Sequence, residues 1–553
     1  MSATTVDDVP HLVDALRDAR RQGLHAAGYF GYEAGTAFEE SLPARQGDPG
    51  LPVAWFGLFE SPTDVDDLQA LLPDPTGAWV GAVTPSIDPD TYAGMFETVQ
   101  RHIAAGDIYQ ANLTFQASAR YAGSPLALYA ALRPRAQAGH GAMVWTGAHW
   151  VLSFSPELFF TLTDRTVTTQ PMKGTAARSA DPRADAAAAD DLRNDPKQQA
   201  ENVMIVDLLR NDLGRVAELG SVSVPALFEV HTYPTVHQLT STVTARLRDG
   251  LDALDLLSHS FPCGSVTGAP KISAMTLLTD LEHSPRGVYC GSIGHLAPSG
   301  DASFNVAIRT LVLDEQRSTA TFGLGSGVVA DSSLDGEWQE CLDKAAFLHL
   351  GRTVELLETM RADPGEGVVR LERHLARLSA SAEVFGLPYD LDAVRDTVRA
   401  SVSALEAPAR LRLRLDGSGA RCETGPLPAV PSTPWSVRVR PLPVDPGDFR
   451  LRHKTTDRAF YDRAREESEA DEVVFVRPDG LLTEGSITAL FVPRDGVLLT
   501  PRLTSGLLDS VLRRELVETG RAVPADLTEA DLSGGFLVGN SLRGLVEARL
   551  VSP

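Results

Sequence analysis

A lysine enclosed by a proline and a glycine is the first residue whose position suggests chemistry. In the stretch TTQPMKGTAAR, residues 168–178, Lys173 follows a segment that alternates apolar and polar residues like a pair of strands. Burial at the end of a sheet strand disfavours an ammonium group, because desolvation penalises the charged form. Lys173 is therefore either a solvated loop lysine or an amine that is held in place to react.

Three glutamates have sequence neighbours that suggest a partner or a chemical role for the carboxylate. Glu157 lies among aromatic residues in SFSPELFF, where burial raises a carboxyl pKa and suits a general acid, although a strand-edge glutamate is the plainer alternative. Glu201 shares a helical face with apolar residues, so it needs a partner. Glu340 and Lys344 are four residues apart, the spacing of a solvated ion pair on a helix.

These residues fall on elements that the periodicity predicts. Helices are expected at 93–105, 199–212, 266–280 and 335–350, and strands at 287–329. The glycine-rich stretch GLGSGVVADS, residues 323–332, either presents backbone N–H groups to an anion or forms a tight turn. A new unit begins near 350–353 with strand, turn and strand, followed by an amphipathic helix that ends at Gly386.

Composition limits the class of protein. The 553 residues suffice for two sizeable cores, and the net charge of −23 argues against binding to nucleic acid or to an anionic membrane. No apolar run approaches the roughly 18 residues that span a bilayer, and no signal-peptide pattern opens the chain. The four cysteines form no CxxC pair, which fits a reducing compartment. We expect a cytoplasmic protein in which any anionic substrate meets local positive groups.

Ten blocks within residues 93–350 resemble the chorismate-utilising synthases, the family of anthranilate synthase and aminodeoxychorismate synthase component I. The blocks, in chain order, are DIYQANLT, SFSPELFF, PMKGTAAR, AENVMIVDLLRNDLGRV, VHQLTSTV, FPCGSVTGAPKISAM, CGSIGHL, AIRTL, GSGVVADS and EWQECLDKA. So many blocks in one order are very specific. The resemblance implies an α+β sandwich of two antiparallel sheets, with helices outside and the site between them.

The resemblance also implies roles for individual residues. Glu201 and Glu340 are expected to hold Mg²⁺, a hard cation that prefers oxygen ligands. Glu157 is expected to protonate the departing 4-hydroxyl of chorismate. The residues expected to bind the substrate are Thr267, Lys271, Arg309, His237, Lys344 and the backbone around Gly325 and Gly327.

The same resemblance gives Lys173 a chemical role. Relatives that resemble anthranilate synthase carry alanine at this position, and those that resemble aminodeoxychorismate synthase carry lysine in a P-x-KGT motif, here PMKGT. The implied reaction has Lys173 attack ring C2 as the 4-hydroxyl leaves, after which ammonia enters at C4 and displaces the lysine. The sequence shows no nucleophile motif of a glutamine amidotransferase, so a separate amidotransferase subunit is expected to supply the ammonia.

The C-terminal third carries a second lysine of interest. Lys454 adjoins Arg452 and His453, and cationic neighbours lower the pKa of an amine, although a surface lysine is the plainer reading of Lys454 alone. The blocks VVRLERHLARL, HKTTDR, LTEGSITALF, TPRLTSGLL and VGNSLRGLVEARL resemble the fold-type IV pyridoxal-phosphate enzymes. That family includes branched-chain and D-amino acid aminotransferases and aminodeoxychorismate lyase. It implies a two-lobed α+β domain over residues 352–553, after a synthase domain over 1–351.

The second resemblance implies a cofactor site. Lys454 is expected to form the Schiff base with pyridoxal phosphate, and Glu484 to pair with the pyridine nitrogen. The residues expected to bind the phosphate are Arg370, the backbone at Ser510 and Val511, and Ser541, with Arg543 a candidate for a substrate carboxylate. These motifs do not separate a lyase from an aminotransferase.

The order of the two domains favours the lyase, because an aminodeoxychorismate lyase consumes the product of the upstream domain. The chain is then a bifunctional enzyme that makes 4-aminobenzoate for folate or another aromatic product. An anthranilate or isochorismate synthase, a C-terminal aminotransferase and a degenerate C-terminal binding module stay open as alternatives. Fold-type IV enzymes are usually dimers, so a homodimer through this domain is expected.

Overall fold

The computed structural model describes residues 1–39, 41–42, 47, 50–136, 139–232, 236–429 and 434–551. Contacts divide the chain into two compact units. Unit 1 comprises Met1–Leu68, Ala82–Ala119 and Leu132–His349, and unit 2 comprises Gln69–Gly81, Arg120–Ala131 and Leu350–Pro553. The predicted division at residues 351–352 follows chain order, whereas the contacts also assign two earlier segments to unit 2.

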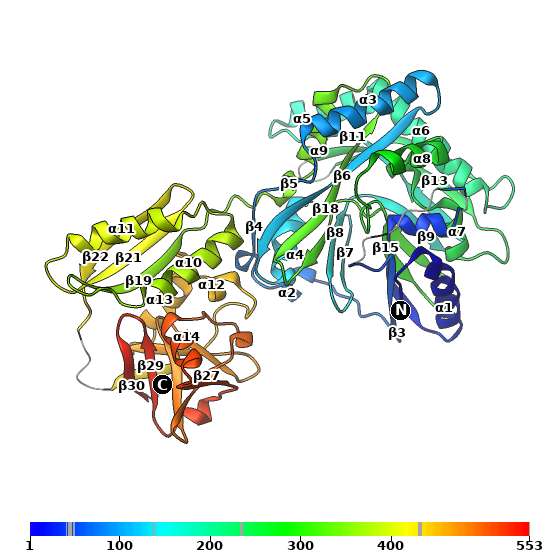
Figure 1. The fold of residues 1–553 in the computed structure, drawn as a ribbon. Coiled ribbons are helices and arrows are strands. Elements are labelled where there is room, and N and C mark those ends of the chain that lie inside the picture. Colours follow the sequence, from blue (N-terminus) through cyan, green and yellow to red (C-terminus); the bar gives the residue numbers. More distant parts are fainter. Residues whose placement is uncertain are drawn as a thin grey trace. The chain divides into compact units, whose positions relative to one another are not determined.

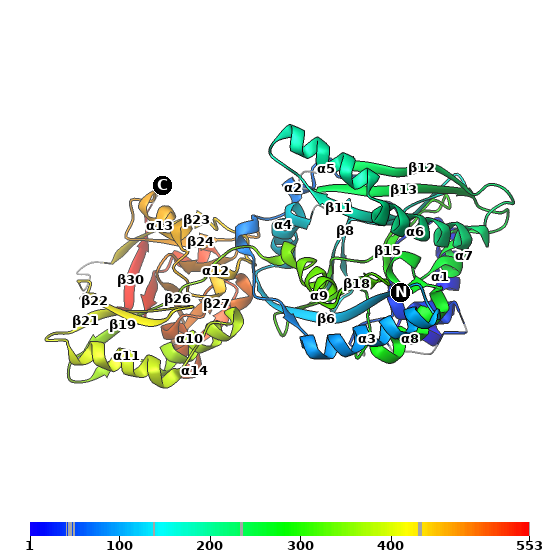
Figure 2. The same cartoon turned by 90° about the horizontal axis from the view of Figure 1, so that it is seen from above.

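Two antiparallel sheets carry unit 1 (Figures 1 and 2). The first sheet runs in the order β1 (Ser2–Ala3), β3 (Ala54–Phe59), β2 (His25–Phe30), β15 (Ser292–Leu296), β16 (Ala302–Asn305), β9 (Leu158–Thr163), β10 (Thr166–Gln170), β13 (Val236–Arg246) and β11 (Met172–Ala177), with β12 (Ser223–Thr232) also on β13. The second runs β14 (Gly268–Ala269), β6 (Gln110–Ala122), β18 (Thr319–Val328), β17 (Thr310–Asp314), β8 (Trp150–Ser155) and β7 (His140–Trp145), with β4 (Trp79–Val80) and β5 (Thr84–Pro85) on β6.

Helices cover these sheets. They are α1 (Val9–Arg21), α3 (Pro89–Ala105), α5 (Pro182–Asn194), α6 (Pro196–Gly214), α7 (Ala253–Ser260), α8 (Lys271–Leu281) and α9 (Leu334–Asp343). Helices α2 (Leu68–Leu71) and α4 (Pro125–Ala136) lie mainly in the two early segments assigned to unit 2. One hydrophobic cluster joins the two sheets, with Tyr29 and Ile293 from the first and Val151 from the second. A larger cluster packs residues of α1, α6 and α7 on the first sheet. The predicted α+β sandwich is confirmed.

Local signals explain several element boundaries. Helix α3 begins after Asp88, whose carboxylate accepts a hydrogen bond from the Thr91 N–H at 2.7 Å, and it ends at Gly106, which has a φ of 81°. The strand expected from residue 287 begins only at Ser292, because Gly287 and Cys290 have φ values of 61° and 62° that break an extended chain. The helix expected over 335–350 stops at Asp343.

Unit 2 has two lobes, each built on a sheet (Figure 1). The smaller sheet runs β20 (Gly367–Val368), β19 (Leu356–Asp363), β21 (Ala409–Asp416) and β22 (Gly419–Pro426), and it is packed by α10 (Leu371–Phe385) and α11 (Leu391–Ser403). The larger sheet runs β25 (Leu482–Gly485), β24 (Glu472–Val476), β23 (Trp435–Pro441), β30 (Gly544–Leu550), β29 (Phe536–Asn540), β26 (Ala489–Arg494), β27 (Val497–Pro501) and β28 (Ala522–Ala525). The remaining helices are α12 (Phe449–Arg452), α13 (Ala459–Glu466) and α14 (Val511–Glu518).

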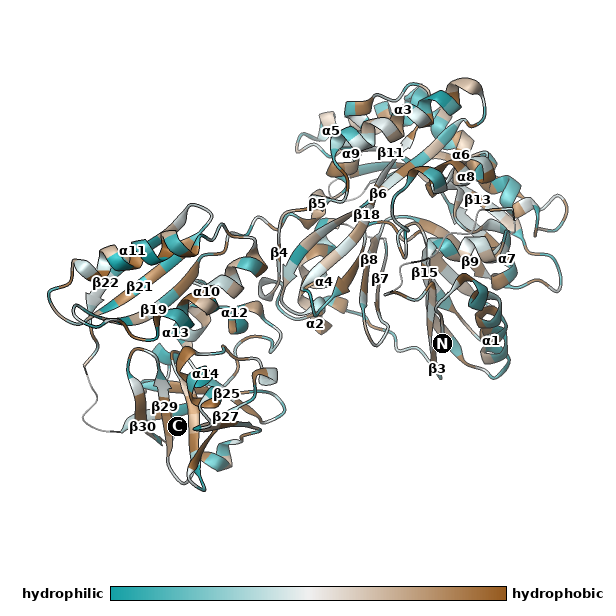
Figure 3. Cartoon of the chain, viewed as in Figure 1, coloured by the Kyte–Doolittle hydropathy of each residue, from teal (hydrophilic) through white to brown (hydrophobic). Residues whose placement is uncertain are grey.

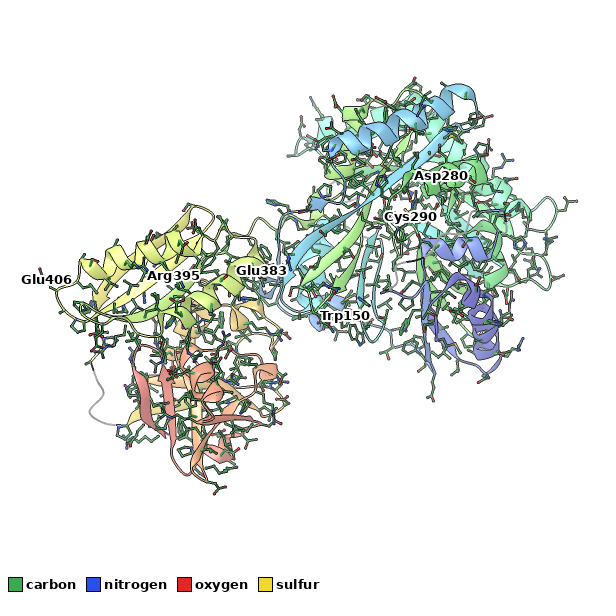
Figure 4. The ribbon with its side chains drawn as sticks, viewed as in Figure 1. Trp150, Asp280, Cys290, Glu383, Arg395 and Glu406 are labelled. Carbon is green, nitrogen blue, oxygen red and sulfur yellow. The ribbon has the colours of Figure 1, made fainter. Side chains whose placement is uncertain are left out.

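Hydropathy follows this architecture in both units. Apolar residues concentrate on the strands and on the inner faces of the helices, and polar residues lie on the outer faces (Figure 3). Figure 4 shows Cys290 inside unit 1, where it is fully buried, and Glu406 at an exposed position after α11. Across the described ranges, no helix is both long and apolar enough to cross a bilayer.

Candidate functional sites

Lys173 lies within a strand rather than in the loop that the proline and glycine suggested. Strands β10 and β11 both pair with β13, and Pro171 separates them. The register of β11 on β13 shifts between Met172 and Thr175, and Gly174 has a φ of 90°. A bulge at this point re-aims the side chain of a strand residue. The partly buried Lys173 amine is thus presented by an irregular strand.

Glu157 occupies the connection between β8 and β9 and is buried. Burial raises the pKa of its carboxyl, and a hydrogen bond from Ser265 and the charges of Lys173 and Lys344 offset part of that rise. A carboxyl group with a raised pKa can carry a proton near neutral pH. The structure therefore brings the predicted general acid within electrostatic range of the predicted nucleophile.

Helices α6 and α9 contribute three further carboxylates. Burial raises the pKa of Glu201, the charges of Lys173 and Lys197 lower it, and those of Glu340 and Glu337 raise it again. Glu337 was not among the predicted site residues, although it stands three positions before Glu340 on one helix face. Its Oε1 accepts a hydrogen bond from Ser332 at 2.6 Å, and its Oε2 is buried without a hydrogen-bond partner.

This donor set fits the Mg²⁺ that the sequence predicts. Among the described residues, no group of three or more His, Cys, Asp or Glu side chains is arranged to hold a metal by itself. Mg²⁺ needs only one or two protein carboxylates when a substrate and water supply the other oxygens. The neighbouring charges of Glu201 and Glu340 and the unpartnered oxygen of Glu337 suit such a cation.

Lys344 connects this acidic group with the glycine-rich strand β18. Its Nζ lies 2.8 Å from Glu340 Oε1, so the ion pair expected from the spacing is present, and it donates a hydrogen bond of 2.8 Å to the Gly325 carbonyl. A Cβ atom added to Gly327 would lie 2.6 Å from Gln110 Nε2 and 3.8 Å from Lys173 Nζ. Gly327 therefore leaves room for the lysine and the amide to approach the strand.

Gln110 is a second site residue that the sequence reasoning missed. It is buried, and its Oε1 has no hydrogen-bond partner among the described residues. A buried acceptor without a partner costs free energy unless a ligand supplies a donor. The block DIYQANLT contained Gln110, but nothing in that block indicated where its side chain lies.

Three predicted substrate residues make hydrogen bonds with other parts of unit 1. Lys271 Nζ lies 2.8 Å from Asp212 Oδ2 and donates to the Ser260 carbonyl. The Thr267 hydroxyl donates to the Gly264 carbonyl at 3.1 Å. His237 uses both ring nitrogens, one with Thr232 at 3.0 Å and the other with Asp185 at 3.1 Å. The roles of these three residues toward substrate stay predictions.

Arg309 is better suited to an anion than those three residues. Its Nη1 donates to the Ala136 carbonyl at 2.9 Å, and no carboxylate within the described part of the chain forms an ion pair with it. Burial lowers the pKa of its guanidinium. A partly buried guanidinium without an acidic partner is favourable for a substrate carboxylate.

Unit 2 contains a cavity of about 580 Å³, within the usual size range of cofactor and ligand sites. Lys454 lies in its wall. Burial lowers the pKa of the Lys454 amine to about 7, and the charges of Arg458 and Arg377 act in the same direction. A neutral amine is thus available near neutral pH, which a carbonyl-binding lysine requires.

Glu484 lies in the same cavity wall. Burial raises its pKa to about 7, while the Tyr461 hydroxyl and the Leu508 N–H, which donate to its Oε1 at 2.6 and 3.0 Å, oppose that rise. Both donors use Oε1, which leaves Oε2 for a donor inside the cavity. A pyridine N–H is a donor of that kind.

The predicted phosphate arginine, Arg370, lies outside the lining of this cavity. Its guanidinium lies 2.6 Å from Glu515. Arg377, on α10, lines the cavity and is held by Glu358, with nitrogen–oxygen distances of 2.8 and 2.6 Å. Arg370 precedes that helix as its N-cap, with a φ of 62°, and the sequence reasoning did not consider Arg377.

The other predicted cofactor residues converge on this cavity. Ser510, Val511, Ser541 and Arg543 all line it. Ser510 is the N-cap of α14, where free N–H groups favour a phosphate. The Ser541 hydroxyl lies 2.8 Å from His374 Nε2. Together with Arg377, Lys454 and Glu484, these groups fit pyridoxal phosphate by donor type and position.

Comparison with known proteins identifies two families along the chain. Residues 3–349 match the model of chorismate binding enzymes, and residues 355–551 match that of class IV amino-transferases. Aminodeoxychorismate synthase component 1 of Klebsiella aerogenes is 40% identical over 346 residues, which cover 58% of this chain and 75% of that protein. The Escherichia coli protein of the same name is 37% identical over 344 residues, with the same coverage.

One solved structure aligns with more than half of the chain. Anthranilate synthase component I from Streptococcus pneumoniae is 32% identical and aligns with a TM-score of 0.52, covering 59% of this chain and 80% of that one.

Proposed function

Because the chain belongs to the chorismate-binding enzymes over residues 3–349 and continues as a class IV aminotransferase domain over 355–551, we propose that it converts chorismate to 4-aminobenzoate in two reactions. Unit 1 replaces the 4-hydroxyl of chorismate with an amino group, and unit 2 removes pyruvate from the product. The observation that carries the proposal is a lysine in each site with a glutamate nearby, Lys173 with Glu157 and Lys454 with Glu484.

The first reaction uses the groups around Lys173. The Lys173 amine forms a bond to ring C2 while the C4–O bond breaks, and the proton on Glu157 goes to the departing hydroxyl, which leaves as water. Ammonia then forms a bond to C4, and the C2–N bond to Lys173 breaks. The sum is chorismate and ammonia giving aminodeoxychorismate and water. Arg309 and the backbone near Gly327 are placed to hold the substrate carboxylates.

Two further components complete this reaction. Glu201 and Glu340, with Glu337 nearby, are the residues that would hold Mg²⁺, and the ion would offset their charge beside a substrate carboxylate. Ammonia is proposed to come from a separate glutamine amidotransferase. The relatives whose names include "component 1" support this division of labour, because the name implies a further component of those enzymes.

The second reaction uses the cavity of unit 2. When bound, pyridoxal phosphate supplies an electron sink for negative charge beside the substrate nitrogen. Lys454 takes the C4 proton, the C3–O bond breaks, and the leaving enolpyruvate gains a proton to become pyruvate. Aromatisation of the ring drives this step. Arg377, Ser510 and Ser541 are placed to bind the cofactor phosphate, and Glu484 to bind the pyridine nitrogen.

One reaction mixture tests both halves. Purified protein receives chorismate, Mg²⁺, ammonium at alkaline pH and pyridoxal phosphate, and the products are separated by chromatography. We expect 4-aminobenzoate from the wild type. Aminodeoxychorismate as the end product would retain the first assignment and give unit 2 another substrate, which a keto-acid acceptor screen would test for aminotransfer. Anthranilate as the product would overturn the assignment of Lys173.

A further inference from the structure

Strand β21 has two chemically distinct faces. Its sequence ARLRLRLD alternates arginine and leucine, and side chains alternate between the faces of a strand. The leucines Leu411, Leu413 and Leu415 are buried in the cluster that α10 and α11 cover. Arg410, Arg412 and Arg414 therefore lie on the opposite face, where all three line the cavity of Lys454.

Positive charge dominates this cavity. Eight arginines and Lys454 line it, against two carboxylates, Asp462 and Glu484. Most of these arginines have acidic partners outside or at the rim of the cavity: Arg377 pairs with Glu358 at 2.6 Å, Arg414 with Glu355 at 3.2 Å and Arg450 with Asp448 at 2.6 Å. The charges of those arginines are balanced by carboxylates of the protein itself.

Three of the cavity arginines lack such partners. Within the described residues, no carboxylate lies within 4.0 Å of Arg410, Arg412 or Arg543. The Nε atoms of Arg410 and Arg412 are buried without a hydrogen-bond partner. Arg543 is oriented by the ring of Trp435, whose centroid lies 5.5 Å from its Cζ.

The three side chains are close enough to repel one another. Burial lowers the pKa of Arg412, and the charges of Arg410 and Arg414 lower it further. Burial also lowers the pKa of Arg543; the charge of Glu472 opposes that effect, and the charges of Arg465 and Arg410 add to it. Unpaired guanidinium groups held together in a partly buried wall cost free energy unless anions neutralise them.

We propose that Arg410, Arg412 and Arg543 form a carboxylate-binding subsite that makes unit 2 selective for a substrate with two carboxylates. Arg377 and α14 already account for the cofactor phosphate, so these three arginines are left for the substrate. A guanidinium binds a carboxylate through two parallel hydrogen bonds, and three of them exceed what one carboxylate needs. The proposal rests on the proposed function and extends it, since aminodeoxychorismate carries two carboxylates and a simple amino acid carries one.

The test compares two acids of equal length on the full chain loaded with pyridoxal phosphate. Glutarate has two carboxylates and valerate has one, and the absorption band of the cofactor reports their binding to this site alone. We expect glutarate to bind at least about tenfold more tightly than valerate, because its second carboxylate forms charged hydrogen bonds that valerate lacks. Arg412→Gln should lose that preference, and Arg412→Lys should recover part of it.

Control variants separate the subsite from a general loss of charge or of folding. Arg399→Gln removes one positive charge from an exposed position on α11 and should leave the preference unchanged. Arg410→Gln provides a second test if Arg412→Gln does not fold. Equal binding of both acids to the wild type, or an unchanged preference in a folded Arg412→Gln or Arg410→Gln protein, would overturn the proposal.

Turnover distinguishes failure of the subsite from failure of the proposed function. With aminodeoxychorismate, Arg412→Gln should lower kcat/KM by roughly ten- to a hundredfold, mainly through KM. If the wild type prefers glutarate but makes no 4-aminobenzoate, the subsite is supported and the lyase activity is rejected. If the wild type makes 4-aminobenzoate but shows no preference for glutarate, the lyase activity is supported and the subsite is rejected.

Discussion

The two units place a lysine of interest in different electrostatic surroundings. Lys173 lies near the carboxylates of Glu157 and Glu201, whereas Lys454 lies near the guanidinium groups of Arg458 and Arg377 as well as the carboxylates of Glu358 and Glu484. The group around Lys173 therefore suits a cation as well as an anionic substrate, whereas arginines outnumber carboxylates in the wall of the unit 2 cavity and favour anions. The net charge of −23 predicts neither arrangement, because a ligand responds to the charges within a few ångströms of it.

The largest effects are expected from the two lysines themselves. Lys173→Ala should slow aminodeoxychorismate formation with ammonium by on the order of a thousandfold or more, since it removes a covalent nucleophile. Lys454→Ala should keep that rate and accumulate aminodeoxychorismate. Arg210→Ala, which removes a positive charge from an exposed position on α6, is the matched control and should behave like the wild type. A Lys173→Ala protein with normal amination would contradict the covalent mechanism.

Metal dependence should separate the two sites cleanly. Chelation of Mg²⁺ should stop the amination in unit 1 and leave the conversion of added aminodeoxychorismate in unit 2 unchanged. Glu201→Gln should raise the Mg²⁺ concentration for half-maximal amination at least about tenfold, because a hard cation loses an anionic oxygen ligand. The exposed Glu229 on β12 offers a control in Glu229→Gln. Equal Mg²⁺ requirements in Glu201→Gln and the wild type would argue against this site.

Substitution of the buried Trp79 should test whether the segment 69–81 stabilises unit 2. The Trp79 ring is buried and stands 4.9 Å from that of Phe385, at 82°. Trp79→Ala should destabilise unit 2 by about 3–5 kcal/mol through the cavity it leaves, lowering the temperature at which the cofactor absorption is lost. Trp145→Ala, at a largely exposed position on β7 of unit 1, should not lower that temperature. If Trp79→Ala loses its cofactor absorption at the same temperature as the wild type, residues 69–81 do not stabilise unit 2.

Cofactor affinity should distinguish Arg377 on α10 from Arg370, the N-cap of that helix. Arg377→Lys keeps a charge beside Glu358 but loses the planar fork that binds a phosphate, so the Kd for pyridoxal phosphate should rise roughly ten- to a hundredfold. Arg370→Lys should change it by less than about threefold, because Arg370 faces Glu515. Titration of the apoprotein by absorbance measures both values, and the reverse order would restore Arg370 as the phosphate ligand.

The smallest effect concerns pH. An amine reacts with a carbonyl in its neutral form, and the lowered pKa of Lys454, about 7, means that this form predominates above neutral pH. The rate of cofactor attachment to the apoprotein should rise about tenfold between pH 6 and pH 8 and then level off, as for a group with that pKa. A rate that keeps climbing to pH 10 would mean that Lys454 titrates like an exposed lysine.

Much of the fold and chemistry could be read from the sequence. Periodicity and caps predicted helices such as α3 with its Gly106 end, and alternating residues predicted the strands, because these signals act within a few residues. The order of motif blocks indicated both families. Lys173, Glu157, Lys454 and Glu484 were singled out by residue type in unusual local surroundings.

The tertiary structure decided proximities that local sequence signals do not carry. Glu201 on α6 lies within electrostatic range of Glu340 and of the unpredicted Glu337 on α9, and Trp79 packs with Phe385, although these segments are far apart in the chain. The resemblance pointed to Arg370 alone, whereas the position of α10 beside the cavity favours Arg377 as the phosphate ligand.

The arginines of β21 make the same point. Their alternation with leucine determined that one face of the strand is cationic, since side chains alternate at every residue. Packing decided the surroundings of each face. Helices α10 and α11 cover the leucines, and the arginines line the cavity of Lys454. The spacing of arginine and leucine along the strand is a property of the sequence, whereas the element that packs on each face depends on the burial of apolar surface across the whole unit.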